Sequence, residues 1–356
     1  MSDHPIHCTA IGLMSGSSLD GLDAVAVEFT LDANSANYKV VSARTFDYPD
    51  RLQNRLASSM DLSAHDLMML DADLGTFMGE KAKLIAEECK GRITLVASHG
   101  HTVFHQPQLK LTTQIGSPAH IAAACQMPVV ADFRSQDVAR GGQGAPLVPI
   151  GDQMLFGGFD YCLNLGGIAN LSYKEGERRM AFDISPANMA LNFLAEKLGK
   201  KYDRGGEIAA SGEVSDSLLA ELEQLEFYQQ PAPRSLGREW FEKFFMPVLE
   251  HSHISVEDKL ATVSEHIAIR VGECLTGHNK RCLITGGGAF NTNLIDRMSG
   301  ISEAELIIPE KEVVEFKEAI IFALLGVLRW TERNNVLSSV TGADSDHCAG
   351  AIYLHA

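Results

Sequence analysis

The sequence predicts an α/β protein built from two domains. Short apolar runs typical of strands alternate with helical periodicity along the whole chain, which is the order that α/β proteins show. The chain has 356 residues, more than one hydrophobic core usually accommodates, and apolar residues make up 45% of it. A pattern of strand, glycine turn and strand also occurs in each half, which favours two related domains.

Charge and cysteine usage argue against several kinds of partner and compartment. The formal net charge of −16 disfavours nucleic acid and anionic membranes, because clustered lysine and arginine bind both. The 7 cysteines are odd in number, scattered and free of any Cys-x-x-Cys pair, so we expect reduced thiols in a cytoplasmic protein. No signal-peptide pattern opens the chain, and its longest apolar run, 319–328, is too short to span a membrane.

Strands and helices of the first half follow from local pattern. The expected strands are 9–13, 23–29, 38–47, 93–97, 111–115 and 128–131. Helices are expected from the start signals Asp61 and Ser63 to about residue 88, and over 118–126. The stretch 140–158 is rich in glycine and proline, which is typical of a boundary. We therefore predict an N-terminal domain of residues 1–145, completed by about 338–356, and a C-terminal domain of residues 146–337.

The second half repeats the alternation of strands and helices. The expected strands are 161–165, 168–173, 179–182 and 281–285. The expected helices begin at about 188 and cover 215–225, 238–246, 256–276, 291–299 and 315–333. The last of these has one apolar face, formed by Phe316, Ile320, Leu324 and Val327. We expect the closing residues, 338–354, to fold back near the first domain.

Residues 11–23, Ile-Gly-Leu-Met-Ser-Gly-Ser-Ser-Leu-Asp-Gly-Leu-Asp, form the most informative segment of the chain. Its glycines let the backbone bend tightly and approach a ligand closely, and successive N–H groups in such a turn can bind an anion. We therefore expect the phosphates of a nucleotide to be held by Gly16, Ser17, Ser18, Leu19, Asp20, Gly21, Leu22 and Asp23. An ordinary polar hairpin loop is the alternative interpretation.

Two further glycine segments predict nucleotide contacts in the second half. Residues 161–173 repeat the order of apolar strand, a turn at Gly166 and Gly167, and apolar strand. Residues 283–291 end a strand and then begin a helix, and a flat ring such as adenine can lie against their bare backbone at Gly286, Gly287 and Gly288. The segment lacks the Gly-Lys-Ser/Thr ending of a P-loop and matches the dinucleotide fingerprint poorly. Together the three segments suit a nucleotide held between two related domains.

Segments along the whole chain match one family in order. They are Gly-Leu-Met-Ser-Gly-Ser-Ser-Leu-Asp-Gly-Leu-Asp (12–23), Ser-His-Gly-His-Thr (98–102), Asp-Phe-Arg (132–134), Gly-Gly-Gln-Gly-Ala-Pro-Leu-Val-Pro (141–149), Asn-Leu-Gly-Gly-Ile-Ala-Asn (164–170), Phe-Asp (182–183) with Pro186 and Asn188, Tyr-Asp (202–203), Ser-Leu-Gly-Arg-Glu (235–239), Thr-Gly-Gly-Gly-Ala (285–289) and Ser-Val-Thr-Gly-Ala (339–343). On these residues the chain resembles the anhydro-N-acetylmuramic acid kinase family, part of the actin-like ATPase and sugar kinase superfamily.

The resemblance implies a two-domain, actin-like ATPase fold of the ribonuclease H-like type, with ATP and Mg²⁺ in a nucleotide cleft between the domains. It implies that ATP phosphorylates O6 of 1,6-anhydro-N-acetylmuramic acid while water opens the anhydro ring, giving N-acetylmuramic acid 6-phosphate and ADP. The implied pathway is peptidoglycan recycling in the cytoplasm, and the implied assembly is a homodimer. A kinase of a different amino or anhydro sugar, and a non-catalytic ATP-binding regulator of the same fold, are the alternatives.

Three aspartates are candidates for the chemistry. The reaction needs a base that activates water at the anomeric carbon, and Asp183 matches the family's catalytic aspartate. Asp183 ends an apolar strand near the second glycine turn; alternatively, it caps the following helix. Asp20 is the candidate ligand of Mg²⁺, directly or through water, because that ion prefers oxygen donors and retains waters. Asp23 either faces the phosphates or satisfies its own backbone in the turn.

The residues expected to bind the sugar are Ser15, His99, His101, Thr102, Arg134, Asp137, Gln143 and Glu318. Arg134 can pair with the lactyl carboxylate through two hydrogen bonds, or form a solvated salt bridge with Asp137. The histidines at 99, 101 and 105 have a spacing that can also hold zinc, but we favour sugar contacts at a strand end. Gln143, in the boundary loop, either lines the cleft or only caps it. Glu318 either matches a family glutamate that meets the sugar or is a surface carboxylate.

The chain also departs from the family pattern. Ser17 stands where threonine is usual, and His101 stands where glutamine is usual. Ser185 and Ala187 replace two glycines that commonly follow the aspartate, so the backbone there is less permissive. The nucleotide-binding segments are intact, and the differences concentrate where we expect the sugar to bind.

Overall fold

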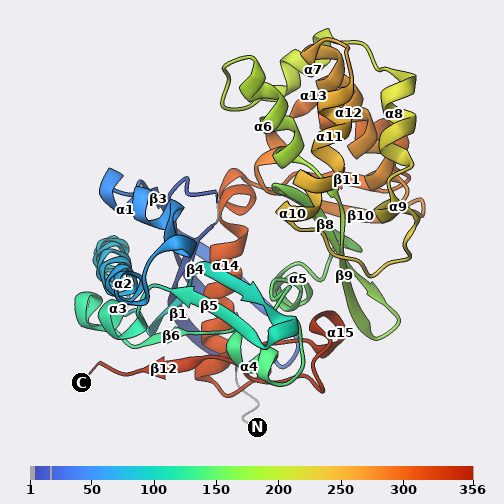
Figure 1. Ribbon diagram of the computed structural model, residues 1–356. Helices are drawn as coiled ribbons and strands as arrows, with labels where there is room; N and C mark the ends of the chain where they lie inside the picture. Colours follow the sequence, from blue (N-terminus) through green and yellow to red (C-terminus); the bar gives the residue numbers. More distant parts are fainter. Residues whose placement is uncertain (1–4, 17, 356) are drawn as a thin grey trace. The chain divides into compact units, whose positions relative to one another are not determined.

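The computed structural model describes residues 5–16 and 18–355, and the chain divides into two compact units (Figure 1). Unit 1 comprises Met1–Gly157 and Phe316–Ala356, and unit 2 comprises Gly158–Glu315. The domain limits expected from the sequence stay a prediction. Within the described residues, no helix is long and apolar enough to cross a membrane.

A 7-stranded sheet forms the centre of unit 1, in the order β12-β6-β4-β1-β2-β3, with β5 paired to β4. Its strands are β1 (Ile6–Ser15), β2 (Leu22–Leu31), β3 (Ala36–Phe46), β4 (Leu95–Gln106), β5 (Leu111–Ile115), β6 (Val129–Ala131) and β12 (Ala351–Tyr353). The first three strands are antiparallel neighbours, whereas β4 runs parallel to β1 and β6 runs parallel to β4. β12 pairs with β6, so the end of the chain joins this sheet.

Helices pack on both faces of the sheet in unit 1 (Figure 1). They are α1 (Asp50–Ala57), α2 (Ala64–Glu87), α3 (Pro118–Cys125), α4 (Ser135–Ala139), α5 (Pro149–Leu155), α14 (Lys311–Trp330, whose first residues belong to unit 2) and α15 (Ser338–Thr341), with short turns η1 (Ser59–Asp61) and η2 (Pro107–Leu109). Side chains alternate along β1, so Ile11 and Leu13 join the core beneath α2 and α3, while Gly12 faces α14.

Close approach of backbones places α14 on the sheet. A Cβ atom at Gly12 would overlap the carbonyl oxygen of Ala319, and one at Gly326 would lie 2.5 Å from the Cβ of Ala97. Glycine at these two positions therefore lets the helix lie directly on β1 and β4. The four residues expected on one face of this helix, Phe316, Ile320, Leu324 and Val327, are all buried, and the middle of α14 is buried on its other faces as well.

A 5-stranded sheet forms the centre of unit 2, in the order β11-β10-β7-β8-β9. Its strands are β7 (Tyr161–Leu165), β8 (Ile168–Glu175), β9 (Arg178–Pro186), β10 (Arg281–Thr285) and β11 (Glu305–Ile307). Its helices and turns are α6 (Asn188–Lys197), η3 (Arg204–Gly206), α7 (Glu207–Ser211), α8 (Asp216–Glu223), α9 (Glu226–Gln229), α10 (Arg238–Trp240), η4 (Phe241–Phe245), α11 (Met246–His251), α12 (Val256–Gly272), η5 (Gly287–Phe290) and α13 (Thr292–Ile301). Apolar residues of α6, α12 and α13 bury one core with this sheet.

The two sheets share one plan. In each unit the first strand pairs antiparallel with the second, and the second pairs antiparallel with the third. On its other side the first strand pairs parallel with a later strand, which pairs parallel with one more. The shared order is β3-β2-β1-β4-β6 in unit 1 and β9-β8-β7-β10-β11 in unit 2. This repetition confirms the α/β class and agrees with the expected actin-like architecture of two related domains.

Some expected elements differ in the structure. The helix start signal at Ser63 is confirmed, because its hydroxyl accepts the amide of Asp66 and α2 begins at the next residue. The single helix expected over 238–246 is instead α10, a π-helical turn and α11. Helices α1, α4 and α5 were not expected. The last begins at Pro149, inside the stretch interpreted as a boundary, because proline suits the first position of a helix.

Candidate active site

The turn between β1 and β2 is held in an unusual conformation by its surroundings. Leu19 adopts a φ of 57°, a left-handed conformation that is rare for residues other than glycine. Its N–H donates to the carbonyl of Gly16, and its own carbonyl accepts a hydrogen bond from the side chain of Gln53 on α1 at 2.8 Å. Ser17, one of the expected phosphate ligands, lies outside the described residues. The side chain of Gln53 therefore stabilises the turn. It lies on α1, a helix that the sequence did not predict.

The two carboxylates of this turn have different surroundings. Asp20 is exposed, and one of its oxygens accepts the hydroxyl of Ser18 at 2.7 Å. Asp23 is half-buried on β2, and its carboxylate accepts the hydroxyl of Thr45 on β3 at 2.6 Å. Among the residues that the structure describes, no three His, Cys, Asp or Glu side chains are grouped to hold a metal ion. Asp20 is the exposed carboxylate of this turn, and carboxylate oxygen is a donor that Mg²⁺ accepts.

A chain of buried hydrogen bonds begins beside the turn. The hydroxyl of Tyr48 donates to Ser15 Oγ at 2.7 Å, and Ser15 Oγ lies 2.9 Å from Nδ1 of His101. Burial lowers the pKa of His101, so its ring is neutral at neutral pH, and burial raises the pKa of Tyr48 to about 12. The hydroxyl of Ser15, which accepts from Tyr48, has its own proton to donate to Nδ1, and in that tautomer Nε2 of His101 carries the ring proton. His101 can therefore donate a hydrogen bond from Nε2.

His99 and Arg134 form a second polar group in unit 1. Burial, followed by the charge of Arg134, lowers the pKa of His99 well below its ordinary value. Arg134 donates from Nε and Nη2 to Nε2 of His99, at 3.1 and 2.8 Å, so the proton of His99 lies on Nδ1 and points to the carbonyl of Gly100 at 2.9 Å. Both ring nitrogens are thus occupied and one faces a cation, which disfavours zinc. Burial lowers the pKa of Arg134 to about 10, so the guanidinium stays charged at neutral pH.

Arg134 and Asp137 both hold the loop that carries Gln143, instead of forming a solvated salt bridge with each other. Arg134 donates from Nη1 to the carbonyl of Gly144 at 2.5 Å, and the amide of Gly144 donates to Asp137 at 2.6 Å. Asp137 has no exposed surface, and its other oxygen accepts the hydroxyl of Thr341 at 2.7 Å. The backbone amide of Gln143 donates to the backbone carbonyl of Thr341. These contacts show that the buried carboxylate of Asp137 holds the loop in place.

Two other expected sugar ligands lie in unit 1. Glu318 on α14 is half-buried, so it is not a surface carboxylate. Burial raises its pKa, and the positive charges of Arg134 and Lys317 oppose that effect. Thr102 is half-buried on β4, where its hydroxyl accepts the side chain of Gln114 at 3.4 Å. β4 continues to Gln106, so the strand end expected at residues 98–102 is corrected: these residues lie inside the strand, at an irregularity where Gly100 has a φ of 75°.

The glycine segments of unit 2 lie against one another. A Cβ atom at Gly286, whose φ is 82°, would lie 2.6 Å from the side-chain oxygen of Asn164, and one at Gly288 would lie 2.6 Å from the Cβ of Leu165. Asn188, the first residue of α6, donates from its side chain to the carbonyl of Leu165 and from its backbone to the carbonyl of Gly166. Amides at the start of α6 also donate to the carbonyl of Gly167. The β7–β8 turn, the start of α6 and the segment after β10 therefore form one glycine-rich surface.

Asp183 is held by a segment far along the chain. Its carboxylate Oδ2 accepts the backbone amide of Leu236 at 2.8 Å and the hydroxyl of Ser235 at 3.1 Å. The first residue of α6 is capped by Ala187 without a side-chain bond, so Asp183 does not cap this helix. Burial raises the pKa of Asp183, and the two hydrogen bonds oppose that rise. β9 does not end at Asp183 as expected but continues to Pro186, after a bulge opposite Ala169 and Asn170.

Sequence reasoning missed several supporting side chains. No sequence motif contains Tyr48, Gln53 or Thr45. Their contacts form only when β3 and α1 pack beside the first turn. Ser235 and Leu236 lie in a segment that matches the family, and that match was the one available signal for their contact with Asp183.

The duplicated sheets, with a polar first turn in unit 1 and a half-buried aspartate in unit 2, define an α/β protein built from two related domains. A family model described as anhydro-N-acetylmuramic acid kinase matches residues 8–355. The chain belongs to the anhydro-N-acetylmuramic acid kinase family.

Relatives with this name cover nearly the whole chain. Those of Hydrogenovibrio crunogenus and Streptomyces coelicolor are 33% and 34% identical to it, over 96% of this chain and over 97% and 93% of their own length. That of Gloeobacter violaceus is 34% identical over 94% of this chain and 95% of its own. Among solved structures, the chain is also similar to a ROK hexokinase from Thermus thermophilus, with 14% identity and a TM-score of 0.39, over 90% of this chain and 99% of that one.

Proposed function

We propose that the protein is an ATP-dependent kinase that converts 1,6-anhydro-N-acetylmuramic acid to N-acetylmuramic acid 6-phosphate, with hydrolytic opening of the anhydro ring. The observation that carries the proposal is membership of the family over residues 8–355, together with Asp183 in its hydrogen-bonded setting. The reaction serves the recycling of peptidoglycan. Because it consumes ATP, we place it in the cytoplasm.

Asp183 is the proposed general base. It takes a proton from water as the water oxygen bonds to the anomeric carbon C1. The bond between C1 and the bridging oxygen breaks, and this oxygen stays on C6 and bonds to the γ-phosphorus of ATP. ADP leaves, and the products are the 6-phosphate and a proton held on Asp183. A general base of this kind contributes about 10²–10⁴-fold to the rate.

The nucleotide contacts proposed for ATP are those of the glycine segments. The turn of unit 1 is the proposed phosphate site, and among its described residues Ser18 has an exposed hydroxyl. The glycines at 166, 167, 286 and 287 are exposed or half-buried and leave backbone accessible to the rest of the nucleotide, whereas Gly288 is buried. Asp20 is the proposed carboxylate for Mg²⁺, which neutralises phosphate charge when bound. The cleft between domains and the homodimer stay predictions of the family resemblance.

The sugar contacts proposed in unit 1 follow from its polar groups. His101 donates from Nε2, and Ser15 holds that ring in place. Each terminal nitrogen of Arg134 carries a second N–H besides the one bonded to its neighbour, so the guanidinium keeps two donors for the lactyl carboxylate. His99 orients that guanidinium. Thr102, Glu318 and the loop of Gln143 complete the proposed set.

A coupled assay of ADP release tests the proposal. Purified protein with Mg²⁺ and ATP is compared on 1,6-anhydro-N-acetylmuramic acid, N-acetylmuramic acid and N-acetylglucosamine. Turnover on the anhydro sugar alone is the expected result. Turnover on another sugar would make the protein a kinase of a different substrate, and ATP binding without turnover on any sugar would make it a non-catalytic regulator.

A further inference from the structure

Besides its pairing with Asn170 on β8, Asp183 forms three hydrogen bonds with one short segment of the chain, residues 234–236. The backbone N–H of Asp183 donates to the carbonyl of Arg234 at 2.9 Å, and its Oδ2 accepts from Ser235 and from the amide of Leu236. The segment therefore forms hydrogen bonds with both the backbone and one carboxylate oxygen of Asp183. Because both carboxylate bonds end on Oδ2, Oδ1 is the oxygen left to accept a proton.

Arg234 anchors this segment to α9. Its guanidinium donates from Nη1 to the carbonyls of Phe227, Tyr228 and Gln230, at 3.3, 3.4 and 2.8 Å. The same group lies over the ring of Phe227, 4.6 Å from its centroid. A cation that meets the last carbonyls of a helical turn satisfies acceptors that the turn itself leaves open. The side chain of Arg234 thus fixes the segment whose backbone holds Asp183.

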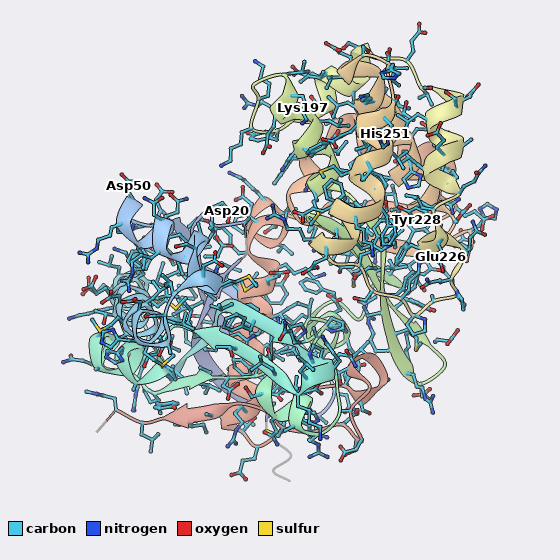
Figure 2. All side chains as sticks on the ribbon, viewed as in Figure 1. Asp20, Asp50, Lys197, Glu226, Tyr228 and His251 are labelled. Carbon is cyan, nitrogen blue, oxygen red and sulfur yellow. The ribbon has the colours of Figure 1, made fainter. Side chains whose placement is uncertain are left out.

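A second link joins α9 to the same strand. Tyr228, labelled in Figure 2 beside Glu226, places its hydroxyl 3.1 Å from the hydroxyl of Ser185 on β9. Tyr228 and Phe227 are both buried, and their rings form an edge contact. β9 is therefore tied to α9 at Asp183, through residues 234–236, and again two residues further along. Such double attachment restrains the strand on either side of its bulge.

We propose that residues 234–236 are a positioning segment that orients the Asp183 carboxylate and sets its affinity for a proton, with Arg234 as the anchor. The inference rests on the proposed function, because it gives the segment its task in that reaction. A hydrogen bond to the charged form of an acid favours that form. The segment therefore keeps Asp183 ionised despite its burial, and it directs Oδ1 toward the attacking water.

The groups around Asp183 make this assignment testable by pH. From the segment it meets the Ser235 hydroxyl and the Leu236 amide, and across the hairpin it is paired with the uncharged Asn170 on β8. The charged guanidinium of Arg234 donates hydrogen bonds to the carbonyls at the end of α9. The influences on the pKa of Asp183 are burial and the two hydrogen bonds. Loss of the Ser235 hydroxyl should thus act on the pKa directly.

The first experiment measures the pH dependence of kcat/KM for the sugar in Ser235→Ala. Without one donor to its charged form, Asp183 should have a higher pKa, so the acidic limb of the profile should move to higher pH by about 1 unit. Ser235→Thr keeps a hydroxyl and should restore the wild-type limb. Ser299→Ala, which removes a hydroxyl bonded only within α13, is the matched control and should leave the profile unchanged. An unmoved limb in Ser235→Ala contradicts the inference.

The second experiment removes the anchor. Arg234→Met keeps an unbranched apolar stem but loses the donors to α9, so kcat should fall by about 10-fold while the KM for ATP stays the same, as expected for a misplaced base. Arg178→Met, at an exposed arginine at the start of β9, the strand that carries Asp183, is the control. Melting curves check that each variant is folded. A folded Arg234→Met protein with the wild-type kcat would overturn the role of the anchor.

A third measurement separates this inference from the proposed function. Carbon-13 NMR of labelled aspartate carboxyls, with the Asp183 signal assigned by its loss in Asp183→Asn, gives the pKa of Asp183 without any turnover. A higher pKa in Ser235→Ala supports the positioning segment even if the protein acts on a different sugar. An identical pKa in wild type and Ser235→Ala overturns it, even if the anhydro sugar is the substrate.

Discussion

The first hairpin turns of the two units occupy the same place in the same strand order, yet they are built differently. In unit 1 the turn between β1 and β2 carries serines and the carboxylates of Asp20 and Asp23, and Gln53 and Thr45 brace it from neighbouring elements. In unit 2 the turn between β7 and β8 is Gly166 and Gly167 alone. Its carbonyls instead receive amides from the start of α6.

This difference assigns different work to the two turns. A polar turn with an exposed carboxylate can meet a cation and phosphate, whereas a bare glycine turn can only offer close approach to backbone. The carboxylate that unit 2 contributes is Asp183, two strands beyond its turn, and a separate segment holds it. On the proposed function, the same sheet plan supplies a carboxylate near the nucleotide in unit 1 and the base that activates water in unit 2.

The largest expected effect belongs to unit 2. Asp183→Asn removes the proposed base, so kcat should fall by about 10²–10⁴-fold, while ATP affinity and melting temperature stay near those of the wild type. Steady-state kinetics and ATP titration measure the two properties. Asp216→Asn, at the exposed start of α8, is the control and should behave as wild type. A near-wild-type kcat in Asp183→Asn would show that Asp183 is not the base.

The next effect tests the glycine surface of unit 2. Gly286→Ala puts a Cβ against Asn164 and Leu165 at a φ of 82°, so it should lower the free energy of unfolding by about 1–3 kcal/mol and weaken ATP binding. Gly300→Ala, where a Cβ would meet open space, is the control. Denaturant unfolding and ATP titration give the two numbers. Unchanged ATP affinity with lost stability would make this glycine purely structural.

A smaller effect distinguishes the carboxylates of unit 1. Asp20→Asn should raise the Mg²⁺ concentration needed for half-maximal rate by roughly 10-fold, the consequence of losing about 1.4 kcal/mol of binding. Asp32→Asn, on an exposed turn of the same unit, should leave the requirement unchanged. Titration of the rate with Mg²⁺ at saturating ATP is the measurement. If wild type, Asp20→Asn and Asp32→Asn need the same Mg²⁺ concentration for half-maximal rate, Asp20 does not bind the ion and has only a structural role in the turn.

The smallest effect concerns pH and the neutral histidine of unit 1. Burial and the positive charge of Arg134 lower the pKa of His99 well below its ordinary value, so the unfolded chain binds a proton at a higher pH than the folded chain. The free energy of unfolding should therefore fall as pH drops below about 6.5, by at most about 1.4 kcal/mol per pH unit. His99→Gln should flatten this dependence, and the exposed control His278→Gln should not. Equal slopes of the free energy of unfolding against pH in wild type, His99→Gln and His278→Gln would show that His99 is not buried as described.

Local pattern predicted those parts of the molecule that local chemistry decides. The glycine turns, the hairpins around them and the starts of α2 and α13 follow from short-range signals such as Ser63 and Asn291, whose side chains accept amides three residues on. α5 was missed because a glycine- and proline-rich stretch hides a seven-residue helix. β4 was cut short because the polar residues at its middle look like a strand end.

Candidate site residues could be predicted as chemical types, but their partners could not. The sequence offers Asp183 and a matching segment at 235–239, yet nothing local says that the two touch. Likewise Asp137 was expected to bind substrate, and its full burial follows from contacts with Thr341, more than two hundred residues away. Such contacts depend on tertiary packing, which periodicity and spacing do not encode.

The most direct test of the account is the mass of the product made from 1,6-anhydro-N-acetylmuramic acid with Mg²⁺ and ATP. Mass spectrometry of the wild-type reaction should show a product heavier than the sugar by one phosphoryl group and one water, with one ADP released per product. The same reaction with Asp183→Asn should show almost none of it. A phosphorylated product that still lacks the water, or ADP without phosphorylated sugar, would contradict the account.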